Sequence, residues 1–163
     1  MKTSLTVLVA LAGLLAFAGP ALSHCEIPCG IYGDAMRIHM MKEDMTTVDK
    51  SMKMIRTLGA EEQSDWNQLV RRVKNKEEHA GKIQHVVTQY WMTQRVKVPK
   101  DGEATPKETY EKQLTLLHKL LVTAMKMKQT TDQAHVDAAR KLVDEFAATY
   151  FSPEDLKHLK DHK

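Results

Sequence analysis

The stretch that decides the fold is residues 41–55, which read MKEDMTTVDKSMKMI. Its apolar residues follow one another at steps of four and three: Met41, Met45, Val48, Met52 and Ile55. That spacing places them on one face of an α-helix and leaves the charged residues on the other face. Gly59 is suited to end such a helix. The pattern therefore predicts an amphipathic helix over about residues 34–58.

Three further stretches carry the same helical spacing, and sparse glycine and proline separate them. We expect helices over about residues 66–94, 107–129 and 132–149, and a short helical turn opened by Ser152 and Pro153. Ser64 and Asp132 are the expected N-caps of the second and fourth helices. The predicted core-facing residues are Trp66, Leu69, Val73, Ala80, Ile83, Val87 and Tyr90, then Tyr110, Leu114, Leu117, Leu121, Ala124 and Met125, and finally His135, Ala138, Ala139, Leu142 and Phe146. Four amphipathic helices with short connections predict an all-α fold, a four-helix bundle.

Composition agrees with one folded domain and excludes some classes of function. The chain has 163 residues, of which 42% are apolar, 28% charged and only 6% aromatic. The low aromatic content argues against an all-β sandwich. The net charge is +3, from 24 basic and 21 acidic residues, which is too even a balance for a nucleic-acid-binding protein.

The first 23 residues have the organisation of a secretory signal peptide. Lys2 supplies the positive charge, Leu5–Phe17 is a short apolar region, and Ala21–Ser23 is a small-x-small cleavage site. We expect cleavage after Ser23, a mature domain of residues 24–163, and an exported protein, periplasmic or secreted, with no membrane segment after processing. An uncleaved anchor and a lipid on Cys25 are the less favoured alternatives.

The expected mature N-terminus gathers metal ligands. It begins His24-Cys25-Glu26-Ile27-Pro28-Cys29-Gly30-Ile31-Tyr32 and holds both cysteines of the chain. Cleavage would free the α-amino group of His24, beside its imidazole, the backbone nitrogen of Cys25 and the two thiolates. Two nitrogens and two sulfurs in a plane, with an optional imidazole above them, favour Ni(II) or Cu(II) over tetrahedral zinc.

The pattern His-Cys-x-x-Pro-Cys-Gly-x-Tyr at a mature N-terminus, ahead of a four-helix bundle, resembles nickel superoxide dismutase. The resemblance implies a metal-binding hook of residues 24–32, in which His24, Cys25 and Cys29 bind one nickel ion per subunit. It implies a cis peptide bond before Pro28 and a catalytic tyrosine at Tyr32. The implied reaction is the disproportionation of superoxide to O₂ and hydrogen peroxide by Ni(III)/Ni(II) cycling, with His24 as the axial ligand, in a homohexamer.

The sequence departs from the family pattern around the axial imidazole. In the family an acidic residue on the first helix and an arginine on the second helix hold that imidazole. The resemblance places His39 where the acidic residue is expected. Lys76, Glu77 and Glu78 are the candidates on the second helix.

Other readings of these residues stay open. Cys25 and Cys29 are able to form a disulfide, and a zinc site with His79 or His85 is a further alternative. The methionines of the first helix suggest an exported Met- and His-rich copper-binding protein without catalytic activity, although Met41, Met45 and Met52 lie on the stripe expected to face the core. A helical interaction protein with an incidental disulfide is the plainest alternative.

Overall fold

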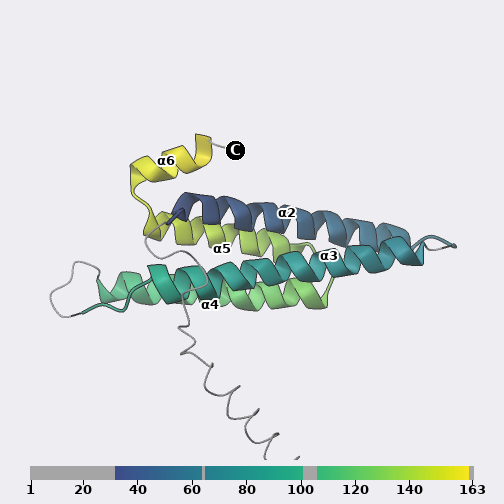
Figure 1. Ribbon diagram of the computed structural model, residues 1–163, viewed down its shortest axis with the longest axis horizontal. Helices are drawn as coiled ribbons and strands as arrows, with labels where there is room; N and C mark the ends of the chain where they lie inside the picture. Colours follow the sequence, from purple (N-terminus) through teal and green to yellow (C-terminus); the bar gives the residue numbers. More distant parts are fainter. Residues whose placement is uncertain (1–31, 64, 101–105, 162–163) are drawn as a thin grey trace, which may run out of the picture. The chain divides into compact units, whose positions relative to one another are not determined.

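The computed structural model describes residues 32–63, 65–100 and 106–161, and every regular element among them is a helix (Figure 1). The chain divides into two units, residues 1–31 and 32–163, and all the described residues belong to the second. The predicted signal peptide and the predicted ligands His24, Cys25 and Cys29 lie outside the described residues. The all-α prediction is confirmed.

Five α-helices and one π-helix make up the described unit. They are α2 (Asp34–Gly59), α3 (Trp66–His85), the π-helix η1 (Val86–Arg95), α4 (Lys107–Gln129), α5 (Ala134–Tyr150) and α6 (Pro153–Asp161). The four long helices predicted from the sequence are present within two residues of their expected ends. The second of them changes character at Val86, where α3 continues directly as η1.

The long helices form a four-membered ring within this unit. The α2 helix packs against α3 and α5, while α4 packs against η1 as well as α3 and α5. The α2–α3 and α4–α5 pairs are both antiparallel hairpins (Figure 1). This arrangement is the four-helix bundle that the periodicity predicts. None of the helices in the described residues is long and apolar enough to cross a membrane.

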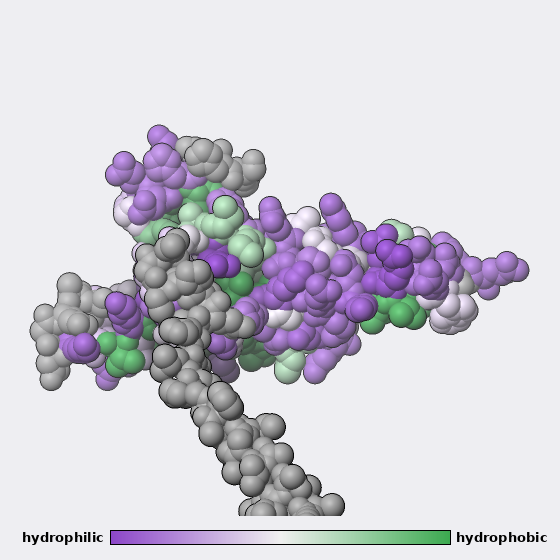
Figure 2. Space-filling view, viewed as in Figure 1, coloured by the Kyte–Doolittle hydropathy of each residue, from purple (hydrophilic) through white to green (hydrophobic). Residues whose placement is uncertain are grey.

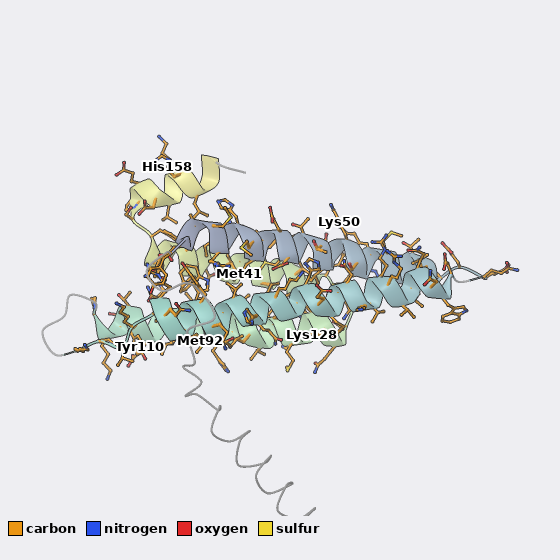
Figure 3. All side chains as sticks on the ribbon, in the orientation of Figure 1. Met41, Lys50, Met92, Tyr110, Lys128 and His158 are labelled. Carbon is orange, nitrogen blue, oxygen red and sulfur yellow. The ribbon has the colours of Figure 1, made fainter. Side chains whose placement is uncertain are left out.

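The stripe of residues 41–55 faces the core. Met41, Met45, Val48 and Met52 are fully buried, and Figure 3 shows Met41 among the side chains inside the bundle. Each fully buried side chain of this size stabilises the fold by roughly 1.5–3 kcal/mol. The methionines at these three positions are therefore core residues.

The core prediction is wrong at three large residues of α3 and α4 and at Ala138 of α5, which are exposed. Trp66 is 70% exposed, Val73 is 40% exposed and Met125 is 42% exposed. Lys76 already contacts the last carbonyls of α4, so the residues of α3 before it lie beyond the end of α4. Their apolar stripe has no part of α4 to pack against there. The surface over the middle of α2 and α3 is hydrophilic, with hydrophobic patches towards the ends (Figure 2).

Helix starts follow the expected capping chemistry with two corrections. Asp65, not Ser64, is the N-cap of α3, and its carboxylate accepts a hydrogen bond from the Gln68 N–H at 3.0 Å. Gln133, not Asp132, is the N-cap of α5, and the Asp132 carboxylate accepts from the Ala134 N–H at 3.0 Å just ahead of that helix. Ser152 accepts from the Asp155 N–H at 3.2 Å and so caps α6, as predicted.

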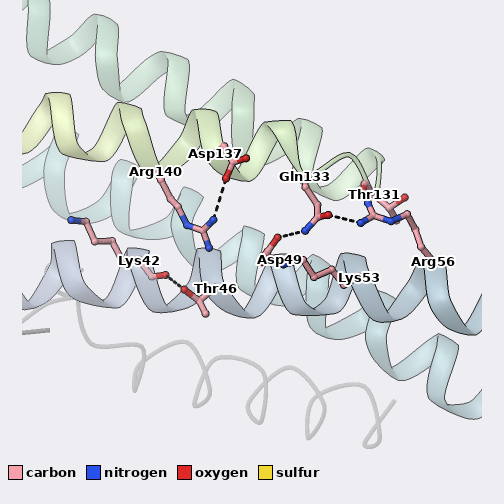
Figure 4. A network of polar contacts seen from close by, with 9 residues as sticks. All are labelled: Lys42, Thr46, Asp49, Lys53, Arg56, Thr131, Gln133, Asp137 and Arg140. Carbon is pink, nitrogen blue, oxygen red and sulfur yellow. Dashed lines mark hydrogen bonds and ion pairs between the residues drawn. The ribbon is translucent and has the colours of Figure 1, made fainter.

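A polar network ties the start of α5 to α2 (Figure 4). Gln133 donates to Asp49 and accepts from Arg56, and Arg56 also donates to the Thr131 carbonyl at 2.5 Å. Lys53 forms an ion pair with Asp49 at 2.8 Å. These contacts fix the α4–α5 connection against the C-terminal half of α2. They leave the opposite end of the bundle, where α2 begins, to be organised by other residues.

Candidate functional site

The N-terminus of α2 carries a carboxylate that gathers hydrogen bonds from two other elements. Asp34 Oδ1 accepts from the Tyr90 phenol and from Arg95 Nε, the latter at 2.8 Å. Its Oδ2 accepts from Arg95 Nη2 at 2.5 Å and from the Tyr150 phenol at 2.8 Å. Two parallel bonds from one guanidinium are a strong and directional form of ion pair. We call Asp34, Tyr90, Arg95 and Tyr150 the Asp34 cluster.

The π-helix explains how η1 contributes two of these donors. Tyr90 and Arg95 are five residues apart, and α-helical geometry would turn their side chains about 140° away from each other. In η1 the repeat is longer, as the bond from Thr93 Oγ1 to the Thr88 carbonyl at 2.7 Å illustrates. Both side chains therefore reach the same carboxylate. The π-helix thus serves to place Arg95 beside Tyr90.

The charges of the cluster are fixed by their surroundings. Burial by itself raises the pKa of Asp34, but hydrogen bonds from Arg95, Tyr90 and Tyr150 outweigh it, and the pKa lies below its ordinary value of 3.8. Burial, and then the hydrogen bond to Asp34, raises the pKa of Tyr150 to about 12 and also raises that of Tyr90. The hydrogen bonds to Asp34 raise the pKa of Arg95.

Tyr32, the predicted catalytic tyrosine, packs on this cluster. The guanidinium carbon of Arg95 lies 4.2 Å from the centroid of the Tyr32 ring, and the Tyr90 ring meets it edge-on with centroids 6.2 Å apart. A cation over an aromatic face is an attractive contact. Tyr32 itself remains 42% exposed. Arg95 and Tyr90 therefore cover one side of the Tyr32 ring, and part of the ring stays open to solvent.

The cluster rests on an aromatic core. Trp91 is fully buried and meets the rings of Tyr90, Phe146 and Tyr150 edge-on, with centroids 5.1, 4.9 and 5.0 Å apart. Such contacts add about 0.5–1.5 kcal/mol each to the burial of the rings. This packing ties η1 to the end of α5 and fixes the two tyrosine donors.

His39 lies on a different face of α2. It lines a groove between α2 and α5 together with Met36, Lys42 and Arg140. The contacts found for the described residues do not include one between His39 and the Asp34 cluster. The placement of His39 beside the imidazole of His24 stays a prediction, since His24 lies outside the described residues.

The candidates on the second helix have other partners. Lys76 is only 4% exposed and donates to the carbonyls of Met127, at 2.9 Å, and Lys128, besides pairing with Glu77 at 2.7 Å. It therefore caps the C-terminus of α4. Lys76 precedes Tyr90 by 14 residues, about 21 Å along a helix. Arg95, which the sequence analysis left out, is the basic residue that reaches Tyr32.

His79, a ligand of the alternative zinc site, is paired with a carboxylate. His79 Nδ1 lies 2.6 Å from Asp44 Oδ1, across the α2–α3 interface. Burial raises the pKa of Asp44 above 3.8, although the bond to His79 opposes that change. His79 is thus a partly buried histidine with a carboxylate partner. Among the described residues, no group of three or more histidine, cysteine, aspartate or glutamate side chains is placed to hold a metal ion.

Sequence reasoning missed most of the Asp34 cluster. Tyr90 falls on the predicted apolar stripe. Arg95 and Tyr150 each lie one residue past an expected helix end, and Asp34 is the first residue of its helix. One signal in the sequence could have indicated the cluster. Its polar residues lie near the ends of helices, and such ends come together in an antiparallel bundle. The π-helix concealed it, because a period of 3.6 residues does not bring Tyr90 and Arg95 together.

Fold and site together define an all-α bundle protein whose tyrosine- and arginine-rich end follows directly on a segment that holds its two cysteines. The family model for nickel-containing superoxide dismutase matches residues 19–154, well over half of the chain. The chain belongs to the nickel-containing superoxide dismutase family. It is therefore an oxidoreductase that disproportionates superoxide and uses nickel as its cofactor. The match gives the copper-binding alternative no support. Comparison with curated proteins and with solved structures gives no match.

Proposed function

We propose that this superoxide dismutase holds its nickel in a hook of residues 24–32. The ligands are the α-amino group and imidazole of His24, the backbone nitrogen and thiolate of Cys25, and the thiolate of Cys29. The observation that carries the proposal is the setting of Tyr32, which ends the motif and sits, partly exposed, on Arg95 and Tyr90.

The donor set fits the metal. Thiolates are soft ligands, and this mixed set of nitrogen and sulfur donors would suit nickel. Nickel, when bound, supplies the one-electron oxidation and reduction that dismutation of superoxide requires. Both cysteines of the chain lie within this segment, so no second pair of thiolates competes for the metal.

Residues around Tyr32 provide a hydrogen-bond donor and positive charge for a small anion. The Tyr32 phenol is able to donate a hydrogen bond to superoxide or to a water molecule. Arg95 lies against its ring, and Arg37 lies 5.0 Å from the centroid of the Tyr90 ring. The Asp34 carboxylate keeps Arg95 in place by its bidentate bonds. We assign to Tyr32 the role of the catalytic residue nearest the bundle, and to Arg95 the role of a positioning residue.

The cellular setting follows from the same segment. We propose that cleavage after Ser23 creates the His24 amine during export, so that the mature enzyme works in the periplasm or outside the cell. We further propose a homohexamer with one nickel ion in each subunit. The exposed apolar residues at the start of α3, Trp66 and Val70, are 70% and 64% exposed and are suited to contact other subunits.

Native mass spectrometry of the exported protein tests these points together. The expected result is a chain that starts at His24, carries one nickel ion and assembles as a hexamer. A metal-free chain two mass units light would indicate a Cys25–Cys29 disulfide. Copper in place of nickel would favour the copper-binding alternative.

Two variants test the ligands directly. One alanine inserted before His24 converts the amine into an amide and is expected to abolish dismutation, while one alanine added after Lys163 serves as the matched control and leaves it intact. Cys29→Ser is expected to lose nickel yet keep its helicity by circular dichroism, because the hook precedes the bundle. Dismutase activity retained in Cys29→Ser would overturn the proposed ligand set.

A further inference from the structure

A polar cavity of about 350 Å³ adjoins the Asp34 cluster and shares Arg95 and Tyr150 with it. Its other lining comes from Lys97, from the first turns of α4 with Thr109 and Gln113, and from Thr149 near the end of α5. The volume corresponds to about twelve water molecules at roughly 30 Å³ each. The cavity therefore has room for a polyatomic ion with part of its hydration shell.

The lining is cationic. Two of its side chains, Arg95 and Lys97, are basic, and no carboxylate of the described residues lines the cavity, while Asp34 beside it balances the charge of Arg95. Asp34 takes up Nε and Nη2 of Arg95 and leaves Nη1 without a partner among the described contacts. Lys97 is exposed and forms no ion pair with a described residue. The charge of the cavity thus favours an anion.

The hydrogen-bonding groups agree with the charge. The Thr109 hydroxyl has no partner among the described contacts and is free to donate. Gln113, only 7% exposed, already donates to the Thr149 carbonyl at 3.0 Å, and the Tyr150 phenol donates to Asp34. The groups left uncommitted are therefore a guanidinium nitrogen, an ammonium and a hydroxyl, all of them donors.

The start of α4 adds to the positive electrostatic potential of the cavity. Pro106 is its N-cap and lines the cavity, and no side chain caps the helix. The first N–H groups of a helix lack partners within it and carry a partial positive charge. This contribution supports the side chains but is secondary to Arg95 and Lys97.

We propose that this cavity binds a small inorganic oxyanion, with Arg95, Lys97 and Thr109 as its donors. Arginine and lysine paired with a hydroxyl match the several acceptor oxygens of a tetrahedral anion. Because Arg95 also contacts Asp34 and the Tyr32 ring, an anion bound in the cavity changes the electrostatic setting of Tyr32. The lining of the site includes none of the proposed nickel ligands.

Inorganic phosphate is the probe that tests the site. The mature nickel-loaded protein is titrated with phosphate at constant ionic strength, maintained with sodium chloride, and binding is followed by the ³¹P line width of phosphate. We expect saturable binding that Lys97→Gln weakens about fivefold, as the loss of one exposed charge contact predicts. Thr109→Val is expected to weaken binding as well. Lys100→Gln, which removes an exposed charge outside the lining, is the matched control and leaves the affinity unchanged.

The outcomes separate this site from the dismutase activity, since the titration reads phosphate binding alone. Saturable binding that Lys97→Gln and Thr109→Val weaken and Lys100→Gln preserves supports the site. Binding that does not saturate, or that Lys97→Gln and Lys100→Gln weaken equally, overturns it. Binding unaffected by both Lys97→Gln and Thr109→Val also overturns it.

Discussion

Replacing Asp34 by asparagine tests whether one carboxylate organises the end of the bundle that carries Tyr32. The change keeps the shape of the side chain and removes its charge. An asparagine retains one acceptor oxygen, so two of the four hydrogen bonds that Asp34 accepts lose their acceptor. The amide N–H₂ group that replaces the other oxygen then faces donors.

The magnitude follows from the bonds that are lost. A hydrogen bond to a charged group contributes about 1.5–3 kcal/mol. The side chains of Asp34 and Arg95 are 17% and 22% exposed, so solvent screening reduces these contributions. We expect Asp34→Asn to lower the free energy of unfolding by about 2–4 kcal/mol at pH 7. Urea denaturation followed by circular dichroism at 222 nm measures it.

The pH dependence provides a second, independent signature. The pKa of Asp34 in the folded state is lowered below 3.8, so the charged carboxylate favours folding. That stabilisation is fully present above the unfolded pKa and is lost as the pH falls through the folded pKa. The difference between wild type and Asp34→Asn should therefore be constant above about pH 5 and shrink below about pH 4.

The control is Asp144→Asn, which removes an exposed carboxylate paired with Lys42 at 2.7 Å. A surface ion pair of this kind contributes about 0–1 kcal/mol. Equal losses in the two variants would refute the reasoning. So would a difference between wild type and Asp34→Asn that stays unchanged down to pH 3.

Three further predictions concern single residues. Tyr32→Phe should keep the nickel content and the unfolding free energy but lower the dismutation rate, measured by pulse radiolysis; an unchanged rate would contradict the role of the phenol. Met45→Ala should lower the unfolding free energy by about 2–5 kcal/mol, whereas Trp66→Ala should change that of the isolated subunit by less than about 1 kcal/mol, because only Met45 is buried. Lys76→Met should lower it by about 1–3 kcal/mol, since two carbonyls of α4 lose their donor, and Lys74→Met, at an exposed position, should not.

The helices were predictable because their stripes are long and regular. The residues from Met41 to Met52 repeat at helical spacing over three turns, and packing confirms them as core. The same spacing was misleading at Trp66 and Val73. Periodicity identifies an apolar face, but it does not give the length of the helix that covers the face. Here α4 does not extend as far as the start of α3, where those residues lie, and the face stays exposed.

The site was predictable only in part, for a different reason. The hook stays a prediction from a local motif, and of its residues only Tyr32 belongs to the described part of the chain. The support beneath Tyr32 is assembled from Asp34, Tyr90, Arg95 and Tyr150, which are far apart in the sequence. It also depends on a π-helix, which no pattern of apolar residues reveals. A local motif can be identified in a single sequence, whereas a cluster of polar residues far apart in the sequence is identified only once the fold is known.

The Asp34 cluster also bears on how the activity should respond to pH. The pKa of Asp34 is lowered from 3.8, while those of Tyr90 and Arg95 are raised and that of Tyr150 is raised to about 12. None of the four therefore changes its charge between about pH 5 and pH 10. The support beneath Tyr32 presents the same charges throughout that interval. Any change of dismutation rate within it must then arise from groups outside the cluster.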